Sequence, residues 1–148
     1  QRGLASWCLG FIGATAANAI KKASKSKNPN VKSAAISALE EHIRQTQDQE
    51  AIQLVESAIN HSAENVQIEA IKLVGKLYRI DSFIPILISK LRNKSPDIRK
   101  ATIMSLMQLQ IKESLDELKC LLKVEQDKDI RRIIILAIEK IHNKTYEN

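Results

Sequence analysis

The sequence predicts an all-α fold, a right-handed α-solenoid built from antiparallel helix pairs. Three observations support this prediction. A helical pattern returns five times along the chain, amphipathic second helices lie between its copies, and the chain has only four glycines, which makes glycine-based hairpin turns rare. Because one helix pair of this length cannot bury both apolar faces alone, successive pairs are expected to stack into a continuous two-layer core.

The clearest copy of the pattern runs from Ser95 to Leu109. Ser95 can cap a helix, and Pro96 and Asp97 suit its first turn. In the first turn of a helix the backbone N–H groups have no intrahelical partner, so a proline, which lacks this N–H, loses no hydrogen bond. A negatively charged aspartate is stabilised by the positive end of the helix dipole. Apolar and small residues then return at helical spacing, so one side of this helix is expected to be buried.

Equivalent helices recur at intervals of roughly 30 to 35 residues, which is the length of a helical repeat. The copies cover residues 1–12, 31–42, 66–77, 98–109 and 130–141. Their sixth positions hold Ser6, Ile36, Ile71, Ile103 and Ile135. This recurring isoleucine is expected to wedge between adjacent repeats, where helices pack closely.

The chain is predicted to form one array over residues 1–148. The expected units are a partial repeat at 1–12 and repeats at about 13–45, 46–79, 80–110 and 111–143. Because the sequence starts at Gln1 in the middle of the pattern, we interpret it as a piece of a longer protein.

Second helices are expected at residues 48–60, 82–91 and 114–124, each with an apolar stripe. A further helix at 14–26 has a thinner stripe. The expected N-caps are Asp48, Ser82 and Ser114, and Pro85 is tolerated because it falls in a first turn.

These residues resemble a known family. The segments Pro96-Asp97-Ile98-Arg99-Lys100-Ala101, Asp129-Ile130-Arg131-Arg132 and Leu9-Gly10 look like the consensus of HEAT repeats, especially the short PBS-lyase-like type. The resemblance implies a HEAT-like, armadillo-type superhelix. Some relatives with this repeat type assist tetrapyrrole attachment to light-harvesting proteins, so a lyase-associated role is a further, less favoured expectation. At the second position of the copies, where Arg99 and Arg131 lie, the family pattern usually has arginine. Lys32 and Gln67 depart from this pattern.

The third, seventh and tenth positions of the copies lie opposite the buried stripe and are expected to form a protein-binding strip. The candidates are Trp7, Ile68, Lys72, Met104, Met107 and Leu136. They predict a non-catalytic scaffold or adaptor that binds a protein partner. For Trp7 an alternative stays open, because a preceding repeat can cover an aromatic side chain of this kind.

Positive charge defines a second candidate surface, because the chain carries a formal net charge of +6. The candidate basic patch contains Lys21, Lys22, Lys25, Lys27, Lys32, Arg99 and Arg131. It fits an acidic protein partner or, as the alternative function, a nucleic-acid phosphate backbone. The structural interpretation is a ladder in which each second-position arginine bonds Asp97, Asp129 or an adjoining helix end. Aromatic residues, at 3% of the chain, are too few to favour single-stranded nucleic acid.

No catalytic, cofactor-binding or metal-binding site is predicted. His42, His61 and His142 are not paired with cysteines or acids at metal-ligand spacing, and a glycine-rich phosphate loop is missing from the sequence. The chain is therefore expected not to be an enzyme.

The compartment is expected to be the cytoplasm. Cys8 and Cys120 lie far apart and resemble packed, reduced thiols. Residues 3–20 are uncharged and could act as a targeting segment, but glycine and polar residues dilute them, so no membrane span is expected. The sequence leaves the oligomeric state open.

Overall fold

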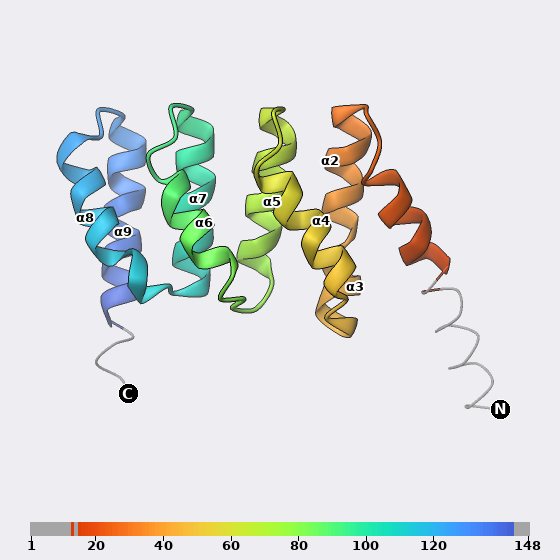
Figure 1. The fold of residues 1–148 in the computed structure, drawn as a ribbon. Coiled ribbons are helices and arrows are strands. Elements are labelled where there is room, and N and C mark those ends of the chain that lie inside the picture. Colours follow the sequence, from red (N-terminus) through yellow and green to blue (C-terminus); the bar gives the residue numbers. More distant parts are fainter. Residues whose placement is uncertain (1–12, 14, 144–148) are drawn as a thin grey trace. The chain divides into compact units, whose positions relative to one another are not determined.

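The computed structural model describes residues 13 and 15–143, and within them every regular element is a helix and none is a strand (Figure 1). This confirms the predicted all-α fold. The chain divides into two compact units, residues 1–69 and 70–148. The single array and the right-handed superhelix stay predictions.

The first unit contains helical residues 15–23, α2 (Pro29–Ala38), α3 (Glu40–Thr46), α4 (Gln49–Ile59) and the start of α5 (Glu64–Lys76). Within it, α2 packs against α4. The helix expected at 31–42 is divided between α2 and α3. At Leu39 the backbone N–H bonds to the Ile36 carbonyl at 3.1 Å, a tighter turn than an α-helix makes.

The second unit holds the end of α5, then α6 (Phe83–Lys90), α7 (Pro96–Leu109), the short 3₁₀ helix η1 (Lys112–Ser114), α8 (Leu115–Val124) and α9 (Lys128–Asn143). Helices α6 and α8 form one layer, and α7 and α9 form the other (Figure 1). Each short helix packs against the long helix that follows it, and α7 packs against α9. These are the antiparallel helix pairs that the sequence predicts.

Two of the predicted caps are confirmed and two are wrong. The Ser95 hydroxyl accepts a hydrogen bond from the Ile98 N–H at 3.4 Å, and the Asp48 carboxylate accepts one from the Glu50 N–H at 3.0 Å. Ser82 and Ser114 make no capping bond, because their backbones are already helical and not extended as a capping residue requires.

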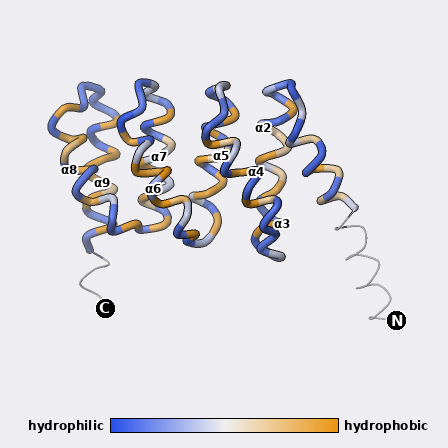
Figure 2. The backbone as a smooth tube through the Cα atoms, viewed as in Figure 1, coloured by the Kyte–Doolittle hydropathy of each residue, from blue (hydrophilic) through white to orange (hydrophobic). Residues whose placement is uncertain are grey.

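The sixth positions of the copies show where the core lies. Ile36, Ile71 and Ile103 are fully buried, as the wedge prediction requires. Ile135, the last of them, is 45% exposed, so the prediction is wrong at this position. Along α7 and α9 hydrophobic stretches recur, while the turns between paired helices are mostly hydrophilic (Figure 2).

The turns before the long helices share one geometry. In each turn, the residue five positions before the start of the copy uses its side chain as a hydrogen-bond acceptor. The donor is the backbone N–H of the residue two positions later, and this bond stabilises the turn locally. The pairs are Ser26 Oγ with Asn28 (3.1 Å), His61 Nδ1 with Ala63 (3.0 Å), Asn93 Oδ1 with Ser95 (2.9 Å) and Glu125 Oε1 with Asp127 (3.2 Å). The same turn geometry therefore repeats in the structure, although four different residue types occupy the accepting position in the sequence.

Candidate protein-binding surfaces

Three residues at the second position of their copies, Gln67, Arg99 and Arg131, tie their helices to the loop before them. The Gln67 side chain donates to the His61 carbonyl. One nitrogen of Arg99 (Nη1) donates to the Asn93 carbonyl at 3.0 Å, and Nη1 of Arg131 donates to the Glu125 carbonyl at 3.0 Å. The acceptor lies six residues before the donor in every case. Arg131 Nη1 also donates to the Leu122 carbonyl at the end of α8, at 2.6 Å, which is the adjoining helix end that the ladder interpretation expects. The bonds to Asp97 or Asp129 that it also allowed are not the ones that Arg99 and Arg131 make.

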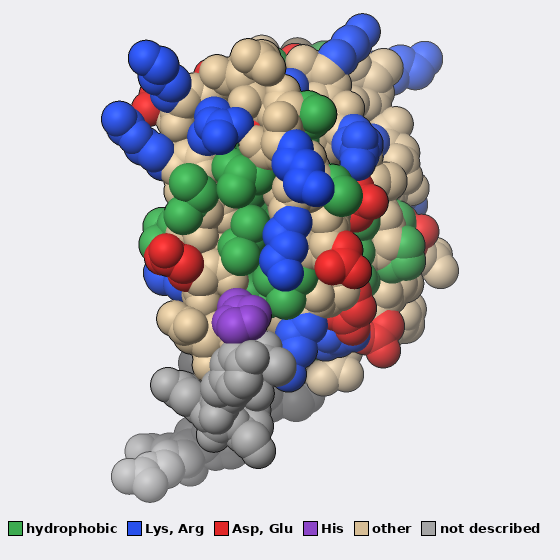
Figure 3. Space-filling model, turned by 90° about the vertical axis from the view of Figure 1, so that its left-hand side faces the viewer, with side chains coloured by type: hydrophobic (Ala, Val, Ile, Leu, Met, Phe, Trp, Pro, Cys, Tyr) green, Lys and Arg blue, Asp and Glu red, His purple; other side chains and the backbone are tan. Residues whose placement is uncertain are grey.

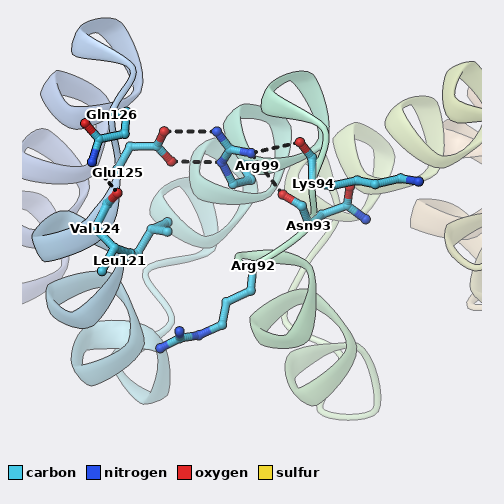
Figure 4. A pocket seen from close by; sticks show the side chains of 8 residues that line it. All are labelled: Arg92, Asn93, Lys94, Arg99, Leu121, Val124, Glu125 and Gln126. Atoms are coloured by element: carbon cyan, nitrogen blue, oxygen red, sulfur yellow. Dashed lines mark hydrogen bonds and ion pairs between the residues drawn. The ribbon is translucent and has the colours of Figure 1, made fainter.

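Arg99 also joins two neighbouring helix pairs. Its Nε lies 2.8 Å from Oε2 of Glu125, and its Nη2 lies 2.9 Å from Oε1, so the pair is bidentate (Figure 4). The Glu125 side chain is only 3% exposed. The hydrogen bonds from Arg99 hold the pKa of Glu125 below its ordinary value. Sequence analysis did not single out Glu125, because its partner lies 26 residues away.

A cleft of about 360 Å³ lies beside this ion pair. Its lining residues come from the α6–α7 turn, from α7, from the end of α8 and from the turn after α8: Arg92, Asn93, Lys94, Arg99, Leu121, Val124, Glu125 and Gln126. Arg92 pairs with Glu117 at 3.1 Å, and Lys94 extends away from Glu125 (Figure 4). Two of the three cations in this cleft are thus held by carboxylates of the chain itself.

The basic patch at residues 21–32 is partly neutralised by acids distant in the sequence. The Lys21 ammonium lies 2.7 Å from Asp48 and 3.2 Å from Glu50, and that of Lys25 lies 3.5 Å from Glu50. The remaining members differ in exposure: Lys22 and Lys27 are exposed, and Lys32 is half-buried.

Asp48 is the centre of this cluster. His42 Nε2 lies 2.8 Å from the same carboxylate oxygen that Lys21 contacts. The hydrogen bond with His42, followed by the one from Lys21, holds the pKa of Asp48 far below its ordinary value. Asp48 therefore links helical residues 15–23 with α3 and caps α4.

The predicted apolar strip is exposed at its seventh positions. In the second unit, Lys72 is exposed, Met104 is 39% exposed and Leu136 is 44% exposed. Met104 lies on α7 and Leu136 on α9, and these helices pack side by side. We call these three residues the seventh-position row.

The other members of the strip are more covered. Met107, at a tenth position, and Ile68, at a third position in the first unit, are both half-buried. Trp7 lies outside the described residues.

Other large apolar side chains are exposed although the sequence analysis did not expect it. They are Val31, Val124 and Ile135, the last of which was expected to be buried, and Val124 is the most exposed at 59%. On the face of the second unit formed by α8 and α9, apolar side chains lie among Lys, Arg, Asp and Glu (Figure 3). The equivalence of Ile135 to three buried isoleucines was visible in the sequence, but its exposure depends on what lies beside it.

Within residues 13 and 15–143, no three His, Cys, Asp or Glu side chains come together as metal ligands. Cys120 is a free thiol and it is exposed, so the prediction of a packed thiol is wrong at this position, and Cys8 lies outside the described residues. None of the helices in this part of the chain is both long and apolar enough to cross a membrane.

Comparison with known proteins agrees with this repeating architecture. The sequence profile of HEAT repeats matches residues 53–139, more than half of the chain. The bilin biosynthesis protein MpeU of Synechococcus sp. (strain WH8020) is 30% identical over 137 residues, which cover 93% of this chain and 46% of MpeU. The chain thus spans about half the length of this relative. With its paired helices, repeated turns and profile match, the chain belongs to the HEAT-repeat family.

Proposed function

We propose that the chain is a protein-binding scaffold and that the seventh-position row is its contact surface. The observation that carries this proposal is the exposure of Met104 and Leu136 at equivalent positions of two adjacent helices. At the sixth position of the same two copies the exposure is not shared, because Ile135 is exposed and Ile103 is fully buried. Methionine is enriched in interfaces, and apolar side chains aligned on neighbouring helices offer a partner a continuous patch.

The charges near this row favour an acidic partner. Lys72, Lys100 and Arg132 are exposed on the same three helices, and the chain as a whole carries a formal net charge of +6. The contact between Arg132 and Asp129 is 3.5 Å long with both side chains 80% exposed, so it restrains Arg132 weakly. An acidic protein surface would meet apolar anchors that have Lys72, Lys100 and Arg132 on the same helices.

Site-specific cross-linking in the source cells tests this proposal. A photo-reactive residue replaces Leu136 in one variant and Val124, which is exposed on α8, in the control. We expect one dominant cross-linked protein from position 136 and not from position 124. Equal cross-linking from both positions, or none from position 136, would contradict the proposed surface.

The cross-linked partner then allows a quantitative test. The double substitution Met104→Ala and Leu136→Ala is expected to weaken its affinity by about tenfold or more, the range of interface anchors. The melting temperature should change little, because both side chains are already partly exposed. Val124→Ala is the matched control and should leave the affinity unchanged.

A role in bilin biosynthesis is the second candidate function. The observation that favours it is the match to MpeU over 93% of this chain. In this role the scaffold would hold a protein that takes part in bilin biosynthesis. Disruption of the gene should change the absorption spectrum of the bilin-bearing proteins in the source cells. An unchanged spectrum would argue against this role while leaving the scaffold proposal open to the cross-linking test.

Nucleic-acid binding through the basic patch has weaker support. Arg99 is bonded to Glu125 and to loop carbonyls, and Lys21 is bonded to two acids. A phosphate backbone would have to displace these partners. A steep fall of nucleic-acid affinity between two salt concentrations would nevertheless favour this alternative.

A further inference from the structure

A polar groove of about 330 Å³ lies between α2 and the start of α5, within the first unit. Its volume is at the lower end of the range of ligand pockets, about 300 to 1,000 Å³. The side chains on its α2 wall are short, so a bound group can approach this helix closely. The lining residues are Asn30, Ser33, Ala34, Ser37, Asn65 and Glu69. We call this cleft the α2–α5 groove.

The two asparagines join the walls of the groove. They precede the first residue of their copies, and Nδ2 of Asn65 donates to Oδ1 of Asn30 at 3.1 Å. This bond leaves Oδ1 of Asn65 and Nδ2 of Asn30 available to a ligand. The hydroxyls of Ser33 and Ser37 also have no hydrogen-bond partner in the part of the chain that the structure describes. The lining therefore offers several neutral oxygen acceptors.

Glu69 is the charged residue among those that line the groove. It is half-buried, and its carboxylate has no hydrogen bond or ion pair with any other described residue. A partly desolvated carboxylate without a partner costs free energy. The fourth position that Glu69 occupies is apolar in every other copy: Leu4, Ala34, Ala101 and Ile133.

The other covered acids show how this chain holds such a carboxylate. Between residues 15 and 143, two buried or half-buried acids lack a cationic partner, Glu56 and Glu69, and Glu69 is the one that lines the groove. The remaining acids of this kind each pair with a Lys or Arg: Glu40, Asp48, Glu117 and Glu125. In the pair of Arg99 with Glu125 the guanidinium binds both carboxylate oxygens. The α2–α5 groove thus contains the acid of such a pair without its cation.

We propose that the α2–α5 groove binds an arginine side chain presented by a short segment of a partner protein. A guanidinium has five N–H donors and no acceptor, so it matches a lining that combines one carboxylate with neutral oxygens. It pairs with Glu69 as Arg99 pairs with Glu125. Nδ2 of Asn30 and Oδ1 of Asn65 then bond the C=O and N–H groups of the segment's backbone, which the short side chains of α2 allow to come close.

This site is separate from the seventh-position row. The groove belongs to the first unit, whereas Lys72, Met104 and Leu136 belong to the second. The charge that each surface attracts is also opposite, since the row is proposed to meet an acidic partner and the groove a cation. The proposal therefore does not depend on the function proposed above, and either can fail without the other.

Binding of the full chain to a peptide array tests the proposal. The peptides have random flanks and carry arginine, lysine or citrulline at the centre, and citrulline has the shape of arginine without its charge. We expect the arginine peptides to bind about tenfold or more tightly than the citrulline peptides, and more tightly than the lysine peptides, because only arginine offers a charged fork. Equal binding by arginine and citrulline, or by arginine and lysine, would overturn the proposed recognition.

Three variants locate the binding site. Glu69→Gln keeps the shape of the side chain and should weaken the binding of arginine peptides about tenfold or more. Glu56→Gln is the matched control, because Glu56 is also half-buried and unpaired but lies on α4 outside the groove lining. It should leave the affinity unchanged. Ser37→Arg fills the groove with a side chain of the chain itself and should abolish binding.

Circular dichroism melts of the three variants show that the changes in binding do not come from unfolding, since all three replace side chains on helix surfaces that are exposed or half-buried. Binding that survives both Glu69→Gln and Ser37→Arg, or equal losses from Glu69→Gln and Glu56→Gln, would overturn the proposal.

Two further measurements identify the source of the arginine. N-acetyl-arginine amide should compete with the peptides only at concentrations about tenfold higher or more, because it lacks most of the segment's backbone. Equal potency would identify a small cationic ligand and overturn the protein segment. Sedimentation should give the same association state with and without Glu69→Gln. A dimer that this substitution dissolves would identify a second copy of this chain as the occupant and likewise overturn the proposal.

Discussion

At the scale of single residues, equivalent positions in the sequence have different physical environments. Ile103 and Ile135 occupy the same repeat position, yet only Ile103 is fully buried. Burial, and not repeat position, determines what each side chain contributes to stability, because the hydrophobic effect depends on the area removed from water.

This difference leads to the first prediction. Ile103→Ala is expected to lower the free energy of unfolding by about 2 to 4 kcal/mol, the range for deleting a large buried side chain. Ile135→Ala in the same chain is expected to change it by less than about 0.5 kcal/mol. Urea denaturation monitored by circular dichroism measures both. Equal losses for the two variants would contradict the packing described for α7 and α9.

The contribution of an ion pair to stability also depends on how deeply it is buried, and this is the basis of the second prediction. Glu125→Gln is expected to cost about 1.5 to 3 kcal/mol, because a charged hydrogen bond at a buried carboxylate is lost. The matched control is Glu117→Gln, which removes the exposed pair with Arg92 and should cost no more than about 1 kcal/mol. Urea midpoints of the two variants decide between a structural and an incidental role for Glu125.

At the scale of elements, one glycine determines how closely two helices of the second unit approach. The Ser105 hydroxyl on α7 donates to the Ile71 carbonyl of α5 at 2.7 Å. A Cβ added at Gly75 would lie 2.6 Å from that hydroxyl oxygen and 2.8 Å from the Ser105 Cα. The absence of a side chain at Gly75 therefore permits this contact between α5 and α7.

The third prediction concerns this contact. Alanine is favoured over glycine in a helix by about 1 kcal/mol, but forcing a methyl group against backbone atoms typically costs about 1 to 3 kcal/mol. Gly75→Ala is therefore expected to lower the melting temperature. Gly13→Ala is the control, since nothing lies within 4 Å of a Cβ at that helical residue. A melting temperature that rises for both variants would show that α5 and α7 can move apart freely.

At the scale of the whole molecule, the paired carboxylates make stability depend on pH. Hydrogen bonds from His42 and Lys21 lower the pKa of Asp48, that from Arg79 lowers the pKa of Glu113, and those from Arg99 lower the pKa of Glu125. Because these pKa values are lower in the folded chain than in the unfolded chain, the unfolded chain binds more protons in acid.

The fourth prediction follows from this sign. The stabilisation from these three groups should be fully present well above their ordinary pKa values of 3.8 for Asp and 4.5 for Glu. It should be lost as the pH falls below these values toward the lowered pKa values of the folded chain. Urea denaturation at pH values from 7 down to 3 measures this loss. The urea concentration at the unfolding midpoint should decrease once the pH is below about 5, and this decrease should be less steep in Glu125→Gln. A midpoint that stays constant to pH 3 would contradict the ion pairs described here.

Much of the fold could be predicted because helical periodicity is local. The spacing of apolar residues around Ile98 and the cap at Ser95 involve residues within a few turns of one another. The cap prediction failed at Ser82 and Ser114. Their residue type suits an N-cap, but their backbones are already helical, so their side chains make no capping bond. The candidate surfaces were located only in part. Met104 and Leu136 are exposed as expected, whereas Arg99 and Lys21 proved to be engaged with acids in other repeats.

The sequence by itself determined the helix pairs, their repeat positions and the family, because each depends on side chains close together along the chain. Only the tertiary structure decided which cation meets which acid and which of several equivalent isoleucines faces water. Those outcomes depend on contacts between residues 25 to 34 positions apart, such as Lys25 with Glu50 and Arg79 with Glu113. A one-dimensional pattern does not encode which helices lie beside each other, and the packing of neighbouring helices is what removes a side chain from water.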